Sequence, residues 1–454
     1  MKRSTTKAAL AAATGLALAA GMAACGGTNG ADGGDAAETP KSDCAAYDQY
    51  GDLKGKSISV YTTFVDIEGA SYEESFKPFS ECTGATIKYE GSKSLTADVL
   101  GRIEAGAVAD LVAFPQPGLL QQAIATGKVL EAPAAVAANV DQYWTASWRD
   151  YGSVDGKLYA APLGASVKSL VWYSPSAFDQ AGYSVPETWD ELLDLTKRIA
   201  DDGVAKPWCV GIADGDATGW VATDWVEDLV LRSAGPEVYD QWVAHEIPFN
   251  DPRIVDSLKE MSKITRDGAY VNAGIGDIQS IAATMWSDAG TPVMDGQCFL
   301  HRQASFYGGY FTDAGAKVAE NGDIWAFYLP SSDPSTKPIL GGGDFVAAFA
   351  DRPEVVAFQT FLSSPEWANT KAKATEGGWT TANSGLEKGN LKSAVDQLAF
   401  GLLADPSAEF RFDGSDLMPG VIGADAFFKQ MTSYFAEGKS EQAVADAIEA
   451  AWPK

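Results

Sequence analysis

Strand-like and helix-like segments alternate along the first part of the chain. Runs rich in β-branched and aromatic residues stand at 56–64, 85–91 and 109–115, and segments with helical spacing of apolar residues lie between them at 72–84 and 95–106. Because parallel strands need a helical crossover between them, this alternation predicts a β-α-β-α-β unit. The expected fold class is therefore α/β.

A second alternating set begins near residue 168. The segment "PETWDELLDLTKRIADDG" predicts a helix over 186–203, with a capping box of Thr188 and Glu191 at its start and Gly203 at its end. The C-terminal third has mostly helical patterns, and 454 residues suffice for two domains. Further strands are expected at 168–174, 208–213, 297–303, 324–330 and 344–350.

The N-terminal residues have the pattern of an export signal. Residues 1–7 are basic, and residues 8–24 are mostly alanine and leucine. The following "MAAC" resembles the lipobox of bacterial lipoproteins. We therefore expect residues 1–24 to be a lipoprotein signal peptide, Cys25 to be lipidated, and residues 25–44 to form a flexible tether. Ordinary cleavage without lipidation is the alternative.

Acidic side chains dominate the charge of the chain, with 61 Asp and Glu against 34 Lys and Arg and a net charge of −27. This excess argues against nucleic acid and anionic membrane surfaces as partners, so membrane contact is expected through the lipid anchor only. The sequence has two histidines, no CxxC pair and no P-loop. We expect no catalytic residue, no cofactor and no metal, although "ADGDATG" leaves calcium as an alternative without the EF-hand spacing.

Five cysteines occur in the chain. Setting the lipidation candidate Cys25 aside leaves an even number, which is typical of disulfide bonds in an exported protein. These four can pair in three ways. They are Cys44, Cys82, Cys209 and Cys298.

Motifs spread over 56–454 have the order and spacing of a known family. The segments "LGRIEAGAVADLVAFPQPGLLQQ", "LYAAPLGASVKSLVWYSPSAFDQ", "GGGDFVAAFA" and "EGGWTTAN" follow one another as in the family 1 extracellular solute-binding proteins. The chain resembles these carbohydrate-capturing subunits of ABC importers. Its segment "WCVGIADGDATGWVATDWVEDL" is most similar to the α-glucoside-binding branch. One departure is Ala109, since the family usually has proline before the residue matching Asp110.

This resemblance implies a two-lobe periplasmic-binding-protein-like fold with three hinge crossings, which we expect near 164–168, 303–307 and 342–346. The lobes would close around a ligand in the cleft between them by hinge bending. Pairing Cys44 with Cys82 and Cys209 with Cys298 is favoured, because each disulfide then stays inside one lobe. The expected boundaries are 45–165 plus 305–343 for lobe one, and 166–304 plus 344–454 for lobe two.

Twelve residues are candidate ligand contacts. A sugar presents apolar C–H faces that pack on aromatic rings and hydroxyl groups that bind carboxylates, amides and cations. Some candidates follow strand ends, others flank the expected crossings, and Trp379 is expected as a stacking ring of lobe two. Core packing, helix capping and surface charge are the alternative roles. The candidates are Phe64, Gln116, Lys168, Trp220, Asp224, Trp225, Arg302, Gly343, Asp344, Trp379, Arg411 and Asp416.

The resemblance implies a monomeric lipoprotein on the extracellular face of the bacterial cell membrane. It would capture a neutral di- or oligosaccharide, with an α-glucoside as the expected ligand, and deliver it to ABC permease subunits without performing chemistry. One alternative is a secreted glycoside-active enzyme that uses paired carboxylates in the cleft. The other is the same fold with a non-sugar ligand such as a polyamine.

Overall fold

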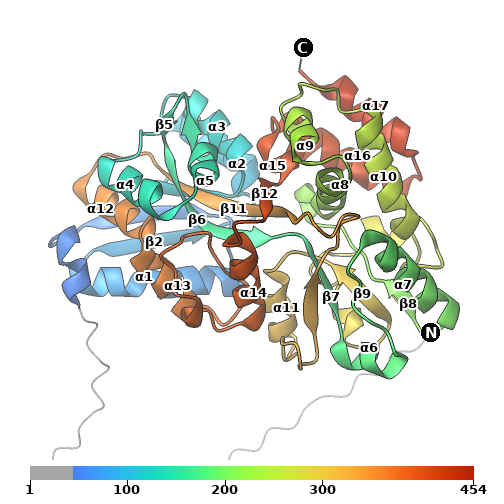
Figure 1. Cartoon of the computed structure of the whole chain (residues 1–454). Helices are drawn as coiled ribbons and strands as arrows, with labels where there is room; N and C mark the ends of the chain where they lie inside the picture. The colour runs from blue at the N-terminus through green and yellow to red at the C-terminus, as the bar shows by residue number, and fades with distance from the viewer. Residues whose placement is uncertain (1–43, 273, 454) are drawn as a thin grey trace, which may run out of the picture. The chain divides into compact units, whose positions relative to one another are not determined.

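The computed structural model describes residues 44–272 and 274–453. The expected signal peptide, the lipidation candidate Cys25 and nearly all of the expected tether lie outside the described residues. Among the described helices, none combines the length and apolar character needed to cross a bilayer. The described residues form two lobes, which we define by the buried apolar clusters that hold them together (Figure 1).

The first lobe is built on a six-stranded sheet with the order β12-β11-β3-β1-β2 and with β6 also paired to β11. The strands are β1 (Ser57–Thr62), β2 (Thr86–Gly91), β3 (Leu111–Phe114), β6 (Ala160–Val167), β11 (Pro338–Ala348) and β12 (Glu409–Phe412). Because β1 pairs in parallel with both β2 and β3, the predicted β-α-β-α-β unit is confirmed. A short hairpin, β4 (Ser153–Val154) and β5 (Lys157–Leu158), precedes β6.

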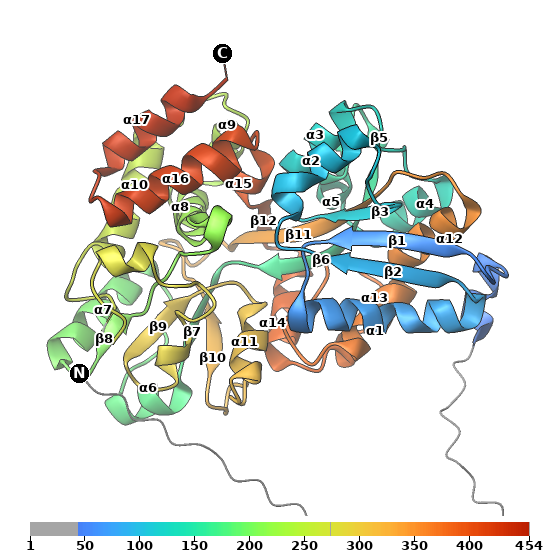
Figure 2. The ribbon, with the colours of Figure 1, turned by 180° about the vertical axis from the view of Figure 1, so that it is seen from behind.

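Helices cover both faces of this sheet, with α1 and α13 on one face and α2 and α3 on the other (Figure 2). This leaves apolar strand residues buried on either side of a mixed sheet, as its parallel strands require. The helices of the first lobe are α1 (Asp66–Thr83), α2 (Leu95–Ala105), α3 (Pro117–Ala125), α4 (Ala134–Tyr143), α5 (Ala146–Tyr151), α12 (Pro353–Leu362) and α13 (Pro365–Ala374), preceded by the 3-10 turn Cys44–Tyr50.

The second lobe has a four-stranded sheet with the order β10-β7-β9-β8. Its strands are β7 (Leu170–Tyr173), β8 (Lys206–Trp208), β9 (Cys298–Arg302) and β10 (Trp325–Tyr328). Its helices are α6 (Pro175–Ala181), α7 (Trp189–Asp202), α8 (Trp220–Ser233), α9 (Pro236–Val243), α10 (Pro252–Thr265), α11 (Tyr307–Asp313), α14 (Ala394–Leu403), α15 (Gly414–Leu417), α16 (Phe428–Ala436) and α17 (Glu441–Ala451). Short 3-10 turns and a π-helical turn at Val421–Phe427 complete it.

The predictions that rest on local sequence signals in this lobe are partly confirmed. Thr188 accepts the N–H of Glu191 and Glu191 accepts the N–H of Thr188, each at 3.2 Å, so the predicted capping box starts α7. The strand expected over 208–213 is wrong except at its first residue, because β8 spans Lys206–Trp208 and ends there. The chain leaves the ladder there, since the side chain of Asn272 binds both the N–H and the carbonyl of Val210.

The predicted boundaries between the lobes are wrong for the last third of the chain. The crossing expected at 303–307 does not occur, because β9 and β10 both pair with β7 in the second lobe. Residues 305–337 therefore stay with the second lobe. Helices α12 and α13 pack into the buried cluster of the first lobe rather than the second.

The described chain passes between the lobes after β6, again along β11, and a third time between Leu391 and Val395, and two further passages lead into and out of β12. The first two passages agree with the crossings expected near 164–168 and 342–346. β12 then joins the sheet edge at residues 338–341 of β11. An edge pairing of this kind depends on distant contacts, which local sequence patterns do not encode.

Two disulfides join Cys44 to Cys82 and Cys209 to Cys298, so the favoured pairing is confirmed and each bond lies inside one lobe. The first ties the turn before β1 to the end of α1, with a sequence separation of 38.

We expect a Cys44→Ser, Cys82→Ser double variant to lose about 4 kcal/mol of unfolding free energy, because opening a loop of this length frees the unfolded chain. Denaturant unfolding of the two proteins under oxidising conditions measures the loss. A loss below about 1 kcal/mol would show that this disulfide does not constrain the unfolded state.

Candidate functional site

The two lobes meet beside the carboxyl ends of the parallel strands of the first lobe. After β3, the side-chain amide of Gln116 donates to Oδ1 of Asp416 in the second lobe at 2.7 Å. Next to it, a Cβ on Gly118 would lie 2.6 Å from the carbonyl oxygen of Met418, so only glycine lets α3 approach α15 this closely. Ligands of open α/β sheets gather at this edge, so the junction is the place to look for a site.

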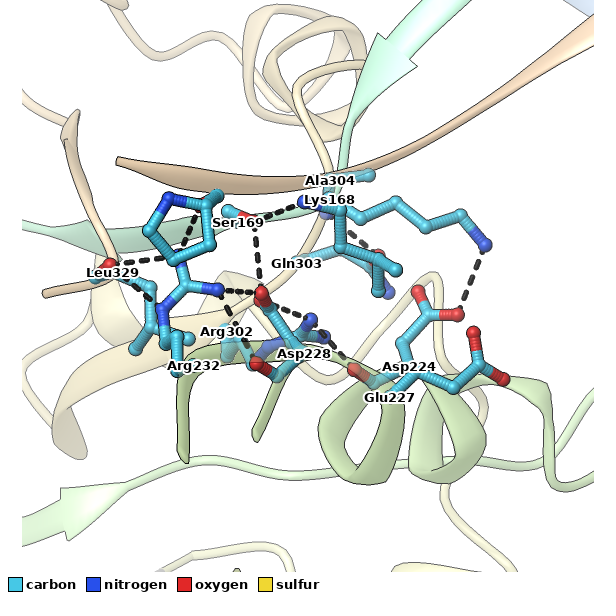
Figure 3. A network of polar contacts seen from close by, with 12 residues as sticks. Lys168, Ser169, Asp224, Glu227, Asp228, Arg232, Arg302, Gln303, Ala304 and Leu329 are labelled. Carbon is cyan, nitrogen blue, oxygen red and sulfur yellow. Dashed lines mark hydrogen bonds and ion pairs between the residues drawn. The ribbon is translucent and has the colours of Figure 1, made fainter. Parts of the chain in front are cut away.

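A buried cluster of charges lies in the second lobe at this junction (Figure 3). The Lys168 ammonium donates to Asp224 Oδ1 at 2.9 Å and also to Asp413. Asp224, Glu227 and Asp413 each bring a carboxylate oxygen within 4.8 Å of the others, and all three are buried. We call Lys168 and these three carboxyl groups the carboxylate cluster. Such a set of oxygens suits a cation, and the Lys168 ammonium supplies one from the chain itself.

Electrostatic interactions keep Lys168 charged and shift the pKa values of Asp224 and Asp413 in opposite directions. Burial lowers the pKa of Lys168, but the charges of Asp224 and Asp413 outweigh burial and raise that pKa well above its usual range. Burial raises the pKa of Asp224 to about 7 against the effect of Lys168. For Asp413, burial is opposed by Lys168 and by hydrogen bonds from its neighbours, which together hold its pKa below the usual range. Lys168 and Asp413 therefore form the ionised pair of the cluster.

Asp228, one residue after the cluster member Glu227 on α8, ties the first two passages to the second lobe (Figure 3). Its Oδ1 accepts the hydroxyl of Ser169 at 2.9 Å, and the Ser169 oxygen accepts the N–H of Leu340 at 2.9 Å. Arg302 donates to Asp228 Oδ2 at 2.7 Å, and Arg232 binds Asp228 as well. Asp224, Glu227 and Asp228 form the acidic face of α8, which thus anchors the segments that join the lobes.

Four half-buried rings form an aromatic group beside this cluster. Trp286 makes edge contacts with Trp220 at 5.3 Å, Phe306 at 5.8 Å and Tyr310 at 5.0 Å between ring centroids. Trp220 also donates its indole N–H to Asp214 at 3.0 Å, and the Lys168 ammonium lies 5.3 Å from its ring. Partly exposed rings flanked by carboxylates can stack on apolar C–H faces and bind hydroxyl groups.

The aromatic group faces the start of α1 in the first lobe. Burial raises the pKa of Tyr310, and the negative charges of Glu68, Asp214 and Asp66 raise it further. Asp66 has a φ of 52°, a left-handed conformation that is unusual for a residue other than glycine. The group therefore has acidic residues of both lobes around it.

A second polar set lies inside the first lobe. Tyr72 stacks on Phe64 with ring centroids 4.6 Å apart and donates its hydroxyl to Asp344 at 3.2 Å. The buried Lys371 ammonium lies 4.4 Å from the Tyr72 ring and 5.1 Å from the ring of Trp379. Burial raises the pKa of Asp344 to about 6. These contacts fix the ring of Phe64, which precedes α1, and the ring of Tyr72, which lies on α1.

Lys371 predicts a pH dependence of stability. Burial lowers its pKa from 10.5 to about 7, so the folded protein binds fewer protons than the unfolded chain between these values. The unfolding free energy is therefore expected to rise with pH from about 7 to about 10.5, by at most about 5 kcal/mol. Lys371→Met should remove this rise. The exposed Lys373→Met on the same helix is the matched control, and equal pH profiles of unfolding for both variants would contradict the assignment.

The structure brings five of the twelve predicted residues to the junction, namely Gln116, Lys168, Trp220, Asp224 and Asp416. Asp224 is fully buried with its Oδ1 on Lys168, so it belongs to the carboxylate cluster, and its expected contact with a ligand stays a prediction. Its position in the middle of α8 excludes the alternative cap role. The first-lobe set holds Phe64, Asp344 and Trp379, and Trp379 packs on Trp367 in the first lobe instead of serving as a ring of lobe two.

The remaining four predictions are corrected. Trp225 is buried in the core against Trp208, with ring centroids 5.5 Å apart. Arg302 is buried, and its guanidinium donates to the backbone carbonyl of Asp224 and to the carboxylate of Asp228 on α8. Arg411 of β12 pairs with Asp240 of α9 at 2.6 Å, so its guanidinium is held in an ion pair between the two lobes.

Gly343 is a packing glycine. A Cβ there would lie 2.5 Å from the carbonyl oxygen of Gly164 and 2.9 Å from Trp148, so its missing side chain serves the pairing of β11 with β6. This pairing explains the glycine without any ligand contact.

Sequence reasoning missed Trp286, Phe306, Tyr310 and Glu227. Phe306 and Tyr310 stand at the start and on the body of the short helix α11, and Trp286 stands outside the helices and strands, so nothing local distinguished these rings from core residues. Glu227 had a usable signal, because it follows Asp224 by three residues and therefore shares a helix face with it.

Comparisons with known proteins agree with this architecture. The profile of the family described as "Bacterial extracellular solute-binding protein" matches residues 66–369. The alpha-glucosides-binding periplasmic protein AglE of Rhizobium meliloti is 37% identical over 421 residues, which are 88% of each chain. The osmoprotective compounds-binding protein GgtB of Synechocystis is 34% identical over 89% of this chain and 94% of its own length.

A solved structure shows the same fold. The bacterial solute receptor AcbH, which has a substrate preference for β-D-galactopyranose, superposes with a TM-score of 0.74 at 16% identity. The match covers 87% of this chain and 98% of AcbH.

Proposed function

This chain belongs to the bacterial extracellular solute-binding proteins, and we propose that it captures a neutral di- or oligosaccharide between its lobes. The observation that carries this proposal is the aromatic group of Trp220, Trp286, Phe306 and Tyr310, half-buried beside carboxylates of both lobes. Rings of this kind offer the flat apolar surface that a pyranose face needs. The carboxylates accept hydrogen bonds from the hydroxyl groups at its rim.

An α-glucoside is the ligand that we propose within this class. AglE, whose name assigns it α-glucosides, is 37% identical to this chain over 88% of its length, which supports an α-glucoside as the ligand. Closure on the ligand would follow from tighter binding to the closed arrangement than to the open one. Neither capture nor closure requires a covalent change in the ligand.

We further propose that Cys25 is acylated and anchors the protein at the outer face of the cell membrane, where ABC permease subunits receive the sugar. The support is the basic and apolar N-terminal pattern followed by "MAAC". Mass spectrometry of the protein isolated from its own cells should find two acyl chains on Cys25. An unmodified Cys25 in the mature protein would contradict the anchor.

Calorimetric titration of the purified protein tests the ligand class. The panel is maltose, trehalose, sucrose, isomaltose, raffinose and spermidine, with analysis of the sugar after each titration. We expect saturable one-to-one binding of an α-glucoside that is recovered intact. Recovery of cleaved sugar would favour a glycoside-active enzyme, and binding of spermidine alone would overturn the sugar assignment.

A further inference from the structure

Glu227 holds the segment that follows β12, where the chain passes from the first lobe into the second. It lies on the acidic face of α8 between Asp224 and Asp228, and it is fully buried (Figure 3). Its Oε2 accepts the N–H of Gly414 at 2.7 Å, and its Oε1 accepts the N–H of Ser415 at 3.1 Å. Both bonds fix the start of α15.

The start of α15 in turn sets the position of Asp416. The Oδ1 atom of Asp413 accepts the hydroxyl of Ser415 at 2.7 Å and the N–H of Asp416 at 3.1 Å. Asp416 then accepts the amide of Gln116 from the first lobe. An uninterrupted series of hydrogen bonds therefore leads from Glu227 to the contact between the lobes.

The charges around Glu227 do not balance if every acid is ionised. Asp224, Glu227 and Asp413 lie within 4.8 Å of one another, and Lys168 pairs with Asp224 and Asp413. Among the described residues, no cation comes within ion-pair distance of Glu227. Three carboxylates on one ammonium would leave unpaired charge in a buried place, which is strongly unfavourable. Glu227 and Asp413 are also within hydrogen-bonding reach, and two carboxyl groups can share such a bond only when one carries a proton.

We propose that Glu227 is a positioning residue that holds the start of α15 as a neutral carboxyl group and donates its proton to Asp413. The proton thus stays on Glu227, and Asp413 remains the charged partner of Lys168. Since Asp416 carries the contact to Gln116, the position of α15 also sets the contact between the lobes. The consequence for capture rests on the proposed function.

The surroundings of Glu227 support its neutral state. Burial raises the pKa of Glu227 well above its usual range, and the Asp413 charge raises it further, while Lys168 acts in the opposite direction. The groups that face Glu227 come from five neighbouring segments. They are Asp224 of α8, Asp413 at the start of α15, Lys168 between β6 and β7, Arg302 of β9 and Tyr239 of α9.

Denaturant unfolding across pH 5 to 9 tests the proton. A carboxyl group whose folded pKa is raised contributes stability below its unfolded pKa, and this contribution is lost as pH rises toward the folded pKa. The unfolding equilibrium constant of the wild-type protein should therefore rise relative to that of Glu227→Gln, by up to tenfold for each pH unit. Glu354→Gln, at a buried glutamate paired with Arg352, is the control and should follow the wild type. Parallel profiles for the wild type and Glu227→Gln would overturn the proposal.

Hydrogen exchange of the Gly414 and Ser415 amides tests the positioning role without any ligand. Glu227→Gln keeps one acceptor oxygen and gains an N–H that can donate to Asp413, so one of the two amides should stay protected as in the wild type, while the other faces the NH2 group and exchanges faster. Glu227→Ala should lose protection at both amides by at least tenfold. If Glu227→Gln exposes both amides as strongly as Glu227→Ala does, a charged carboxylate is required and the proposal fails. Should Glu227→Ala not fold, comparison of Glu227→Gln with the wild type decides alone.

Maltose titration at pH 6 and pH 9 tests the consequence for capture. The wild-type affinity should fall at least threefold at the higher pH, and the affinity of Glu227→Gln should stay constant. A fall of equal size in both proteins would overturn the link between Glu227 and capture. Absence of maltose binding in the wild type at both pH values would contradict the proposed ligand instead, and unfolding and exchange would still decide the state of Glu227.

Discussion

Lys168→Met is expected to lower the unfolding free energy by about 3–5 kcal/mol at neutral pH. The variant removes the ammonium that pairs with Asp224 and Asp413 and leaves three buried carboxyl groups without a cation of their own. The loss should shrink as the pH falls, because protonation of Asp413 then removes the unpaired charge. Denaturant unfolding at pH 5 and pH 8 measures both effects.

Lys197→Met provides the matched control for this prediction. Lys197 pairs with Asp201 on α7, but both side chains are more than 60% exposed, so the change should cost less than about 1 kcal/mol. Equal losses for the two variants, or a loss for Lys168→Met that does not depend on pH, would show that the carboxylate cluster does not need its lysine.

Trp286→Ala is expected to weaken sugar binding by about 30-fold or more, which corresponds to about 2 kcal/mol or more for a central aromatic contact. Trp286 touches the other three rings of the aromatic group, so its removal takes away the middle of the proposed stacking surface. Calorimetric titration with the best α-glucoside of the panel measures the change.

Trp452→Ala is the control for this binding experiment. Trp452 is also half-buried and stacks on a ring, that of His245 at 3.9 Å, but it lies at the end of α17 and outside the aromatic group. Its replacement should leave the affinity within about twofold while the protein stays folded. An unchanged affinity in Trp286→Ala would remove the aromatic group from the ligand site.

The fold was predictable where local patterns determine it. The β-α-β-α-β unit follows from alternating strand and helix periodicity, and the capping box of α7 follows from Thr188 and Glu191 alone. The disulfide pairing came from the family resemblance rather than from spacing. The lobe to which β10 and α12 belong depends on long-range contacts, so the boundaries drawn from sequence placed both in the wrong lobe.

The site was predictable only in part, for a physical reason. Trp220 and Trp225 are five residues apart on the same helix, and a rotation of about 140° puts one at the half-exposed surface and the other in the core. Glu227, Asp224 and Asp228 form an acidic face on a buried helix. This pattern indicates that the carboxyl groups have buried polar or cationic partners, but it does not identify those residues. The rings of Trp286 and Tyr310 meet only after folding.

The most direct test of the account is a crystal structure of the protein grown with a saturating concentration of the α-glucoside that binds best. We predict sugar density between the lobes, with one pyranose ring in van der Waals contact with Trp220 or Trp286 and hydroxyl groups within hydrogen-bonding distance of carboxylates from both lobes. Sugar bound away from the aromatic group would contradict the proposed site. Crystals without sugar density at saturation would contradict the proposed function itself.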